Sequence, residues 1–401
     1  MLPTLNHPSL TLARSVGGVV VAMALMLTGC AAQPRIDTVE ALDYPPWLLS
    51  GERLFERPIV IDEEVPDVAV QEASDVMRAY VERLVTSEGR LASRRFRQLL
   101  AGLSRDGFFR STYSAHRTLT AAETFEARNG NCLSYTNMFI ALAREAGLDA
   151  VYQVVDVPPS WDADAGFLIR YTHINVLIKN LHLGGRYDHS VNVDFNDVLP
   201  ALDYPRREVS DEYAKALYFA NQSVALLRAG QSRASFGHLR RAIETDPGNA
   251  DLWINLGAFY ATEGDFAASV EAYKVALQID GNNKPALSGL ARNYANAGDL
   301  QQAAFYREKV RNYRETNPFY HFAMAQAAFD AAEFERSLDY INAAIGLNRR
   351  TARFHLLKGL VEQKLGDYEA AESSFRRARR HGLEASDERD LMHSLVGMNA
   401  S

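Results

Sequence analysis

The chain has 401 residues, of which 47% are hydrophobic and 23% are charged. These values are ordinary for globular proteins, and the length suffices for two or three domains with ample core. The formal net charge of −7 argues against nucleic acid as the main partner.

The first 30 residues carry an export pattern. Arg14 precedes an apolar run over residues 16–27, which is shorter than the roughly 20 residues that a membrane span needs. We interpret residues 1–29 as a signal peptide. Leu27-Thr28-Gly29-Cys30 resembles the lipobox of bacterial lipoproteins, which implies that Cys30 is lipidated and becomes the mature N-terminus. An ordinary signal peptide with a chance cysteine is the alternative.

The residue after this cysteine bears on location. Ala31 stands where an Asp would resemble an inner-membrane retention signal. The resemblance therefore implies a lipid anchor in the cell envelope, at the outer membrane and facing the periplasm. Residues 30–46, which contain three prolines, are expected to form a tether.

Residues 47–205 are expected to form the first folded domain. Between Val68 and Ser104, apolar residues three or four apart predict helices, with a break at Gly89. Further along, Asn129-Gly130-Asn131 suits a turn and an N-cap, and residues 132–146 suit a buried helix that ends at Gly147.

Cys132 is therefore expected in the first turn of that helix. The positive end of the helix dipole lowers the pKa of a thiol there, which favours the reactive thiolate. If Cys30 carries lipid, Cys132 has no disulfide partner within the chain, because the chain has only two cysteines.

Three strands are predicted after Gly147, over residues 151–155, 167–178 and 191–195. The period of two places His173 and Asn175 on one face of the second strand, and Asn192 and Asp194 on one face of the third. If the two strands pair, these polar sets share a face of the sheet.

Cys132, His173 and Asp194, in this order on a helix start and two strands, resemble the transglutaminase-like superfamily of papain-like fold over residues 110–200. The resemblance implies that Cys132 is the nucleophile, His173 the base and Asp194 the residue that orients the base. The Cys132 N–H would be one oxyanion donor. The family often has Pro after this Asp, whereas Phe195 follows here, so Asp188 and Asp197 stay open as substitutes.

Residues 206–384 show a 34-residue period that resembles the tetratricopeptide repeat. The unit that begins at Ala250 has large and small residues at the positions where this repeat has them, and four other units align with it. The five repeats lie near residues 216–249, 250–283, 284–317, 318–351 and 352–384, and residues 385–401 are expected to cap the array. Two residues, Arg307 and Glu362, depart from the residue types of the pattern. We favour sequence drift within a stacked array as the reason. The fold class is thus an α+β domain followed by an all-α superhelical solenoid.

Two functions follow from this organisation. The first is an envelope enzyme that acts on amide bonds through the Cys132, His173 and Asp194 triad, as a peptidase or amidase in preference to a transglutaminase, with the repeat groove recruiting a protein or peptide. The second is a non-catalytic scaffold whose first domain is inactive.

Other candidate sites are weaker. No cofactor motif is present. His173, His182 and His189 with Cys132 lack the paired spacing of a zinc site. The four arginines of residues 376–380 suit a solvated helix face better than a contact with an anionic lipid.

Overall fold

The computed structural model describes most of the chain from Thr38 onward. The described ranges are 38–85, 91–108, 112–114, 117–155, 160–162, 167–169, 173–181, 189–195 and 206–382. The predicted signal peptide, Cys30, and the predicted cap over residues 385–401 lie outside them. Among the described residues, no helix combines the length and the apolar character needed to cross a bilayer.

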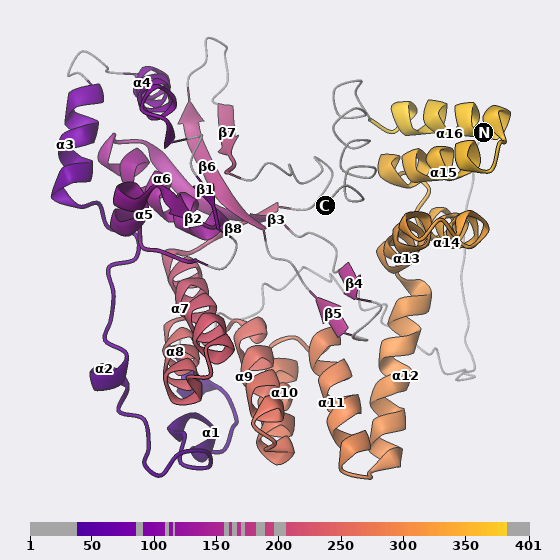
Figure 1. The fold of residues 1–401 in the computed structure, drawn as a ribbon, viewed down its shortest axis with the longest axis horizontal. Helices are drawn as coiled ribbons and strands as arrows, with labels where there is room; N and C mark the ends of the chain where they lie inside the picture. The colour runs from indigo at the N-terminus through magenta and orange to yellow at the C-terminus, as the bar shows by residue number, and fades with distance from the viewer. Residues whose placement is uncertain are drawn as a thin grey trace, which may run out of the picture. The chain divides into compact units, whose positions relative to one another are not determined.

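The first domain is built on an antiparallel sheet (Figure 1). Its strand order is β7-β6-β3-β8. The bounds are β3 Asp149–Val155, β6 His173–Leu181, β7 His189–Val193 and β8 Arg206–Val209. Two short pairs lie outside it, namely β1 Thr112–Tyr113 with β2 Asn129–Gly130, and β4 Ser160–Asp162 with β5 Phe167–Ile169.

Helix α6, Cys132–Glu145, covers the apolar face of this sheet. Its side chains reach the sheet at two points: the Tyr152 hydroxyl donates to Asn137 Oδ1 at 2.8 Å, and Thr136 Oγ1 donates to the Ile174 carbonyl at 3.3 Å. The remaining elements of this half precede the helix: 3-10 helix η1 Val39–Ala41, α1 Trp47–Ser50, α2 Ile61–Glu64, α3 Asp75–Leu84, α4 Ala92–Arg105 and α5 Ala121–Ala127.

Two sequence predictions about strands were wrong. The predicted strand over residues 167–178 is not one strand, because β5 pairs with β4 and only β6 enters the main sheet. The predicted boundary between the first domain and the repeats, at residue 206, is also wrong, because β8 pairs with β3 and so belongs to the first domain. Its Arg206, Arg207 and Glu208 carry no apolar alternation, because an edge strand needs little burial to pair.

The second half is an array of helix pairs. The pairs are α7 Asp211–Arg228 with α8 Ser232–Thr245, α9 Ala250–Thr262 with α10 Phe266–Ile279, α11 Lys284–Asn296 with α12 Leu300–Thr316, α13 Pro318–Asp330 with α14 Phe334–Leu347, and α15 Ala352–Lys364 with α16 Tyr368–Arg380. Successive second helices begin 34 residues apart, as do the first helices from α9 on. The expected fold class is confirmed.

Glycines and aromatic rings interlock within the array. A Cβ at Gly257 or Gly289 would lie 2.7 or 2.4 Å from the ring of Tyr273, so both positions require glycine. Tyr273 is 2% exposed and fills the space between α9 and α11. In the last pair, Gly359 accommodates Phe375 in the same way, at 2.4 Å.

The two departures from the repeat pattern have structural explanations. Arg307 is exposed, so no apolar contact is missing around it. Glu362 is buried, but it accepts a hydrogen bond from Ser374 Oγ at 2.7 Å and lies 3.6 Å from Lys358 Nζ. A buried carboxylate with these partners is satisfied and serves the packing of α15 on α16.

Residues 38–67, here called the N-terminal strap, pack along the first two helix pairs. Residues 38–46 were predicted to be a tether, but Tyr44 lies 5.3 Å from the ring of Trp253, and Asp43 exchanges two hydrogen bonds with Gln278. Further along, the Tyr260 hydroxyl donates to the Leu48 carbonyl at 2.8 Å. The correction follows from burial: the apolar residues of this segment find partners on helices more than 200 positions away in sequence.

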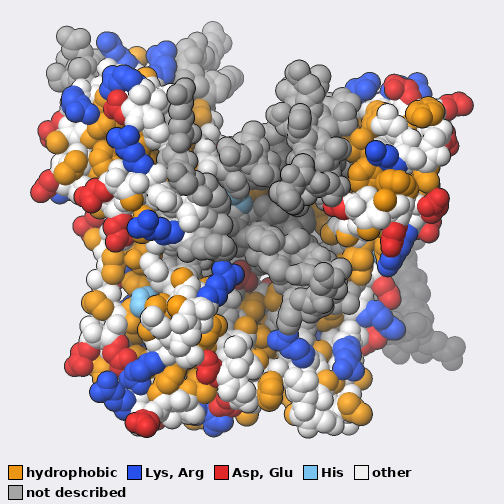
Figure 2. Space-filling model, viewed as in Figure 1, with side chains coloured by type: hydrophobic (Ala, Val, Ile, Leu, Met, Phe, Trp, Pro, Cys, Tyr) orange, Lys and Arg blue, Asp and Glu red, His pale blue; other side chains and the backbone are white. Residues whose placement is uncertain are grey.

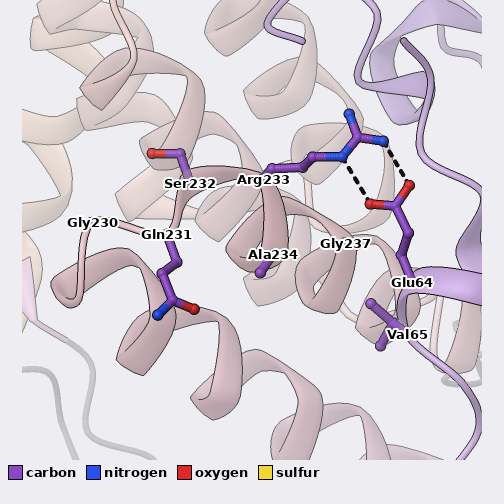
Figure 3. A pocket seen from close by; sticks show the side chains of 8 residues that line it. All are labelled: Glu64, Val65, Gly230, Gln231, Ser232, Arg233, Ala234 and Gly237. Atoms are coloured by element: carbon purple, nitrogen blue, oxygen red, sulfur yellow. Dashed lines mark hydrogen bonds and ion pairs between the residues drawn. The ribbon is translucent and has the colours of Figure 1, made fainter. Parts of the chain in front are cut away.

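A hollow of about 530 Å³ lies where the strap meets α8 (Figure 3). Its one basic side chain, Arg233, forms a double ion pair with Glu64 and also donates to the Arg57 and Pro58 carbonyls. Because these partners use the guanidinium, the hollow is a joint between strap and array rather than an anion site.

The buried apolar side chains of the described residues form two clusters. The first runs from Leu42 through the sheet domain to Leu290, so the strap, the sheet domain and the first helix pairs share one core. The second lies between Phe322 and Ala378, within α13–α16. Figure 2 shows basic and acidic side chains interspersed over the face in view.

Candidate active site

The turn before α6 is held by a network of short polar contacts. Asn131 caps the helix by accepting from the Ser134 amide at 3.0 Å, and its Nδ2 donates to Thr118 Oγ1 at 2.7 Å. The Ser134 hydroxyl accepts from the Leu119 amide at 2.8 Å. Cys132 therefore stands in the first turn of the helix, as the sequence predicts.

Gly130 is required for this turn. Its φ is +155°, and a Cβ there would lie 2.6 Å from the Cβ of Ser134, the residue that braces the cap. Any side chain at this position would displace either the cap or the strand pair that precedes it.

His173 and Asp194 are brought together by the pairing of β6 with β7. The register joins Val176 to Val193, which places residues 175 and 194 opposite each other on one face. His173 Nε2 lies 2.6 Å from Asp194 Oδ2, and Asn175 Nδ2 donates to the same oxygen at 3.2 Å. The expected shared polar face is therefore present, and Nδ1 is the ring nitrogen left for proton transfer.

Burial distinguishes these side chains from ordinary polar surface residues. His173 is 7% exposed and Asn175 is 1% exposed. The importance of Asn175 beyond its place on the face was not recognised from sequence, although its spacing of two from His173 was the available signal.

Cys132 lies beside the start of β6, next to the backbone of Ile174. Burial raises the pKa of its thiol, the backbone amide of Leu133 lowers it, and the charge of Asp194 raises it again; the net pKa is raised. The expectation of a lowered pKa was therefore wrong for the protein without substrate. The helix-start effect exists, but desolvation of the thiolate outweighs it.

The thiol and the proposed base are not joined by a hydrogen bond in the described part of the chain. Among the described residues, no hydrogen bond joins Cys132 Sγ to the His173 ring. Catalytic hydrogen bonds are often long in proteins without substrate and tighten when substrate binds.

Phe195 has a clear role in place of the proline common in the family. Its ring stacks on Tyr135 at 6.0 Å and contacts Phe139 at 5.5 Å, so it fastens the end of β7 to α6. Asp194, the preceding residue, is thereby held on the opposite face. The substitutes Asp188 and Asp197 lie outside the described residues, as does His182.

The described residues contain no group of three or more His, Cys, Asp or Glu side chains that could hold a metal ion. The four arginines near residue 380 are exposed on α16.

A family model described as the transglutaminase-like superfamily matches residues 78–182, a range that contains Cys132 and His173 and ends before Asp194. A tetratricopeptide repeat model matches residues 221–284 and 322–386. The chain carries a transglutaminase-like domain followed by tetratricopeptide repeats. The two matches agree with the sheet domain and the helix pairs described above.

Relatives resemble only part of this chain. Superkiller protein 3 of Schizosaccharomyces pombe is 20% identical over 190 residues, which cover 45% of this chain and 13% of that protein. A TPR repeat-containing protein of Methanocaldococcus jannaschii is 25% identical over 183 residues, which cover 43% of this chain and 29% of that protein. The human PEX5-related protein is 31% identical over 96 residues, or 24% of this chain and 15% of its own length. This chain thus spans less than a third of each.

Among solved structures, MamA from Desulfovibrio magneticus RS-1 is similar at 16% identity and a TM-score of 0.25. The likeness covers 43% of this chain and 96% of the MamA chain.

Proposed function

We propose that the transglutaminase-like domain cleaves amide bonds of a protein or peptide through a thioester on Cys132. The observation that carries this proposal is the 2.6 Å contact between His173 Nε2 and Asp194 Oδ2, at the start of the strand that Cys132 adjoins. A nucleophile at a helix start, a base and a carboxylate that orients the base are the groups that acyl transfer needs.

The steps assign one role to each group. His173 Nδ1 takes the Cys132 proton as sulfur attacks the carbonyl carbon, and the C–N bond then breaks as the imidazolium returns that proton to the leaving amine. Asp194 holds the imidazole tautomer and stabilises the imidazolium. Water then attacks the thioester, which releases the acid and restores the thiol. We favour hydrolysis over transamidation because water is the default acceptor.

The repeats support protein interaction, and their place in the fold suggests how recruitment serves the site. Strand β5, which ends shortly before His173, lies against α11, and β4 lies against α13. These are first helices of the third and fourth repeats. A polypeptide bound along the array would thus meet the segment that leads directly into the catalytic strand.

The cellular location in the proposal comes from the N-terminal sequence. A signal peptide over residues 1–29 and a lipidated Cys30 would anchor the protein in the bacterial envelope, at the outer membrane facing the periplasm. Globomycin or Cys30→Ser is expected to alter processing and release the protein from membranes. A Cys30→Ser protein that stays with membranes after a high-salt wash would contradict the anchor.

The test of catalysis is labelling of the native full-length protein with a thiol-directed probe between pH 5 and 9, with mass spectrometry of the Cys132 peptide. Labelling of Cys132 is expected to be strongest at the upper end of this range, because burial raises the pKa of the thiol in the protein without substrate. If the native protein takes no label at Cys132 at any pH in this range, the nucleophile assignment is wrong.

A second candidate function is a scaffold with an inactive first domain. The raised pKa of the Cys132 thiol, together with the lack of a hydrogen bond to His173 among the described residues, favours it. Expression of Cys132→Ala in a deletion strain separates the two: full correction of the deletion phenotype would assign scaffolding, and failure with normal protein levels would assign catalysis.

A further inference from the structure

Asn175 contacts the same carboxylate oxygen as the proposed base. Its Nδ2 donates to Asp194 Oδ2 at 3.2 Å, and that oxygen also pairs with His173 Nε2 at 2.6 Å. The side chain is 1% exposed, so water does not compete for this contact.

The orientation of the Asn175 amide follows from its partner. A carboxylate only accepts hydrogen bonds, so the nitrogen must face Asp194 and the oxygen must point away. Among the described residues, Oδ1 is then buried without a partner. A buried acceptor without a donor is destabilising, but Gln153 Oε1 and Asn293 Oδ1 are in the same condition, so the oxygen alone assigns no role to Asn175.

Gln153 provides an internal comparison for Asn175. It is the direct partner of Asn175 across the β3–β6 ladder and shares its face. It is 7% exposed, and its Oε1 is also buried without a partner. Of the two amides, however, Asn175 is the one that donates a hydrogen bond to Asp194. Gln153 therefore serves as the comparison for an amide on this face without that bond to the proposed triad.

We propose that Asn175 is a positioning residue for the proposed Cys132, His173 and Asp194 triad. Its donated hydrogen bond fixes the rotation of the Asp194 carboxylate so that Oδ2 faces His173 Nε2. The proton of the neutral imidazole then stays on Nε2, and Nδ1 stays available to accept the proton of Cys132. This inference rests on the proposed function, because it assigns Asn175 a role only if Cys132 is activated by His173.

The charged groups that share this environment are few among the described residues. The register places Asp149 of β3, His173 and Lys179 of β6, and Arg206 and Glu208 of β8 on the same face, and Lys179 pairs with Glu208. Asp194 follows β7, and Cys132 approaches from α6. The pH response of the thiol therefore reports mainly on His173 and Asp194.

The experiment compares Asn175→Val with Asn175→Thr in the full-length protein. The two residues are close in size and both suit a strand, but only threonine can donate a hydrogen bond to Asp194. Alkylation of Cys132 by iodoacetamide is followed from pH 5 to 9 by mass spectrometry of its peptide, which separates Cys132 from Cys30. Thermal melting is measured in parallel.

For Asn175→Val, we expect the midpoint of the alkylation profile to rise by about one, so that alkylation below pH 6 is about tenfold slower. Asn175→Thr is expected to stay near the wild-type profile. Gln153→Leu, the matched control, should leave the midpoint in place. Little change of melting temperature is expected for Asn175→Val, because removal of the unpartnered oxygen offsets the loss of the donor to Asp194.

The outcomes distinguish the positioning role of Asn175 from the proposed catalytic function. A wild-type profile that changes with His173→Gln, together with identical profiles for the valine and threonine variants, overturns the role of Asn175 alone. A wild-type profile that is unaffected by His173→Gln overturns the proposed function, and the positioning role with it.

Discussion

The repeats and the sheet domain use buried polar side chains in opposite ways. In three repeats a serine at the same position donates to the carbonyl twelve residues earlier, in the pairs Ser235–Ser223, Ser269–Gly257 and Ser337–Ala325 at 2.8, 2.5 and 2.6 Å. In the sheet domain, His173 and Asn175 converge on one oxygen of Asp194.

This difference separates polar groups that hold a fold from polar groups that serve chemistry. A serine that recurs every 34 or 68 residues and is fully satisfied joins the two helices of a pair. The sheet-domain cluster instead gathers two side chains on one carboxylate oxygen. Its unpaired amide oxygen does not set it apart, because Asn293 Oδ1 in the array is also buried without a partner among the described residues. Substitution of a repeat serine should lower the free energy of unfolding and leave the reactivity of Cys132 unchanged. Substitution in the Asp194 cluster should change the reactivity of Cys132 and leave the free energy of unfolding nearly unchanged.

The largest expected effect is on the site. His173→Gln keeps a donor toward Asp194 but removes the base, so a typical triad loss of several orders of magnitude in turnover is expected once a substrate is known. Labelling of Cys132 at pH 7 should fall by about tenfold or more, because the thiol without a base is mostly protonated. Glutamine is preferred to alanine because His173 is buried, and alanine would leave Asp194 without this partner. A severe drop in melting temperature would assign His173 a structural role.

In the array, Tyr273→Ala should have the largest effect on stability. The ring is 2% exposed between Gly257 and Gly289, and its removal leaves a cavity worth about 3–5 kcal/mol of unfolding free energy. Denaturant unfolding measures this loss. Since one hydrophobic cluster joins the second repeat to the sheet domain, both should unfold together. Slower labelling of Cys132 in the folded variant would contradict the separation between side chains that stabilise the fold and side chains that serve the site.

Ser269→Ala tests the recurring serine directly. The change leaves the Gly257 carbonyl and Asn293 Nδ2, which donates to Ser269 Oγ at 2.6 Å, without their partner. A loss of about 1–3 kcal/mol is expected in the same unfolding assay. Ser232→Ala, at a half-buried position whose hydrogen bond to Glu263 is exposed to solvent, is the matched control and should cost less. Equal losses for the two variants would remove the distinction between buried and solvent-exposed hydrogen bonds of serine.

The smallest expected effect is the pH dependence of the attachment of the N-terminal strap to the array. Hydrogen bonds from Arg233 hold the pKa of Glu64 below its ordinary value. A lowered folded-state pKa means that the pair stabilises strap attachment above the ordinary carboxyl pKa, and that this stability is lost as pH falls through the lowered value. Hydrogen-exchange protection of residues 38–67 should therefore decline below about pH 4, while that of α15 stays. Glu64→Gln should flatten the response, and an unchanged slope would exclude this pair as its source.

Local sequence determined the parts of this protein whose cause lies within a few residues. The 34-residue register placed the starts of four first helices, because small and large residues recur within each hairpin. Asn131 capped α6, and the period of two put His173 and Asn175 on one face, since capping and pleating are properties of neighbouring residues.

Only the tertiary structure decided features that depend on distant partners. The charged strand β8 joined the sheet because β3 offered an edge, and residues 38–46 packed on α9 and α10 rather than forming a tether. The pKa of Cys132 rose because burial outweighed the helix start. The convergence of Asn175 and His173 on Asp194 required the β6–β7 register. Pairing and desolvation depend on groups that are brought close only by folding, so no local pattern records them.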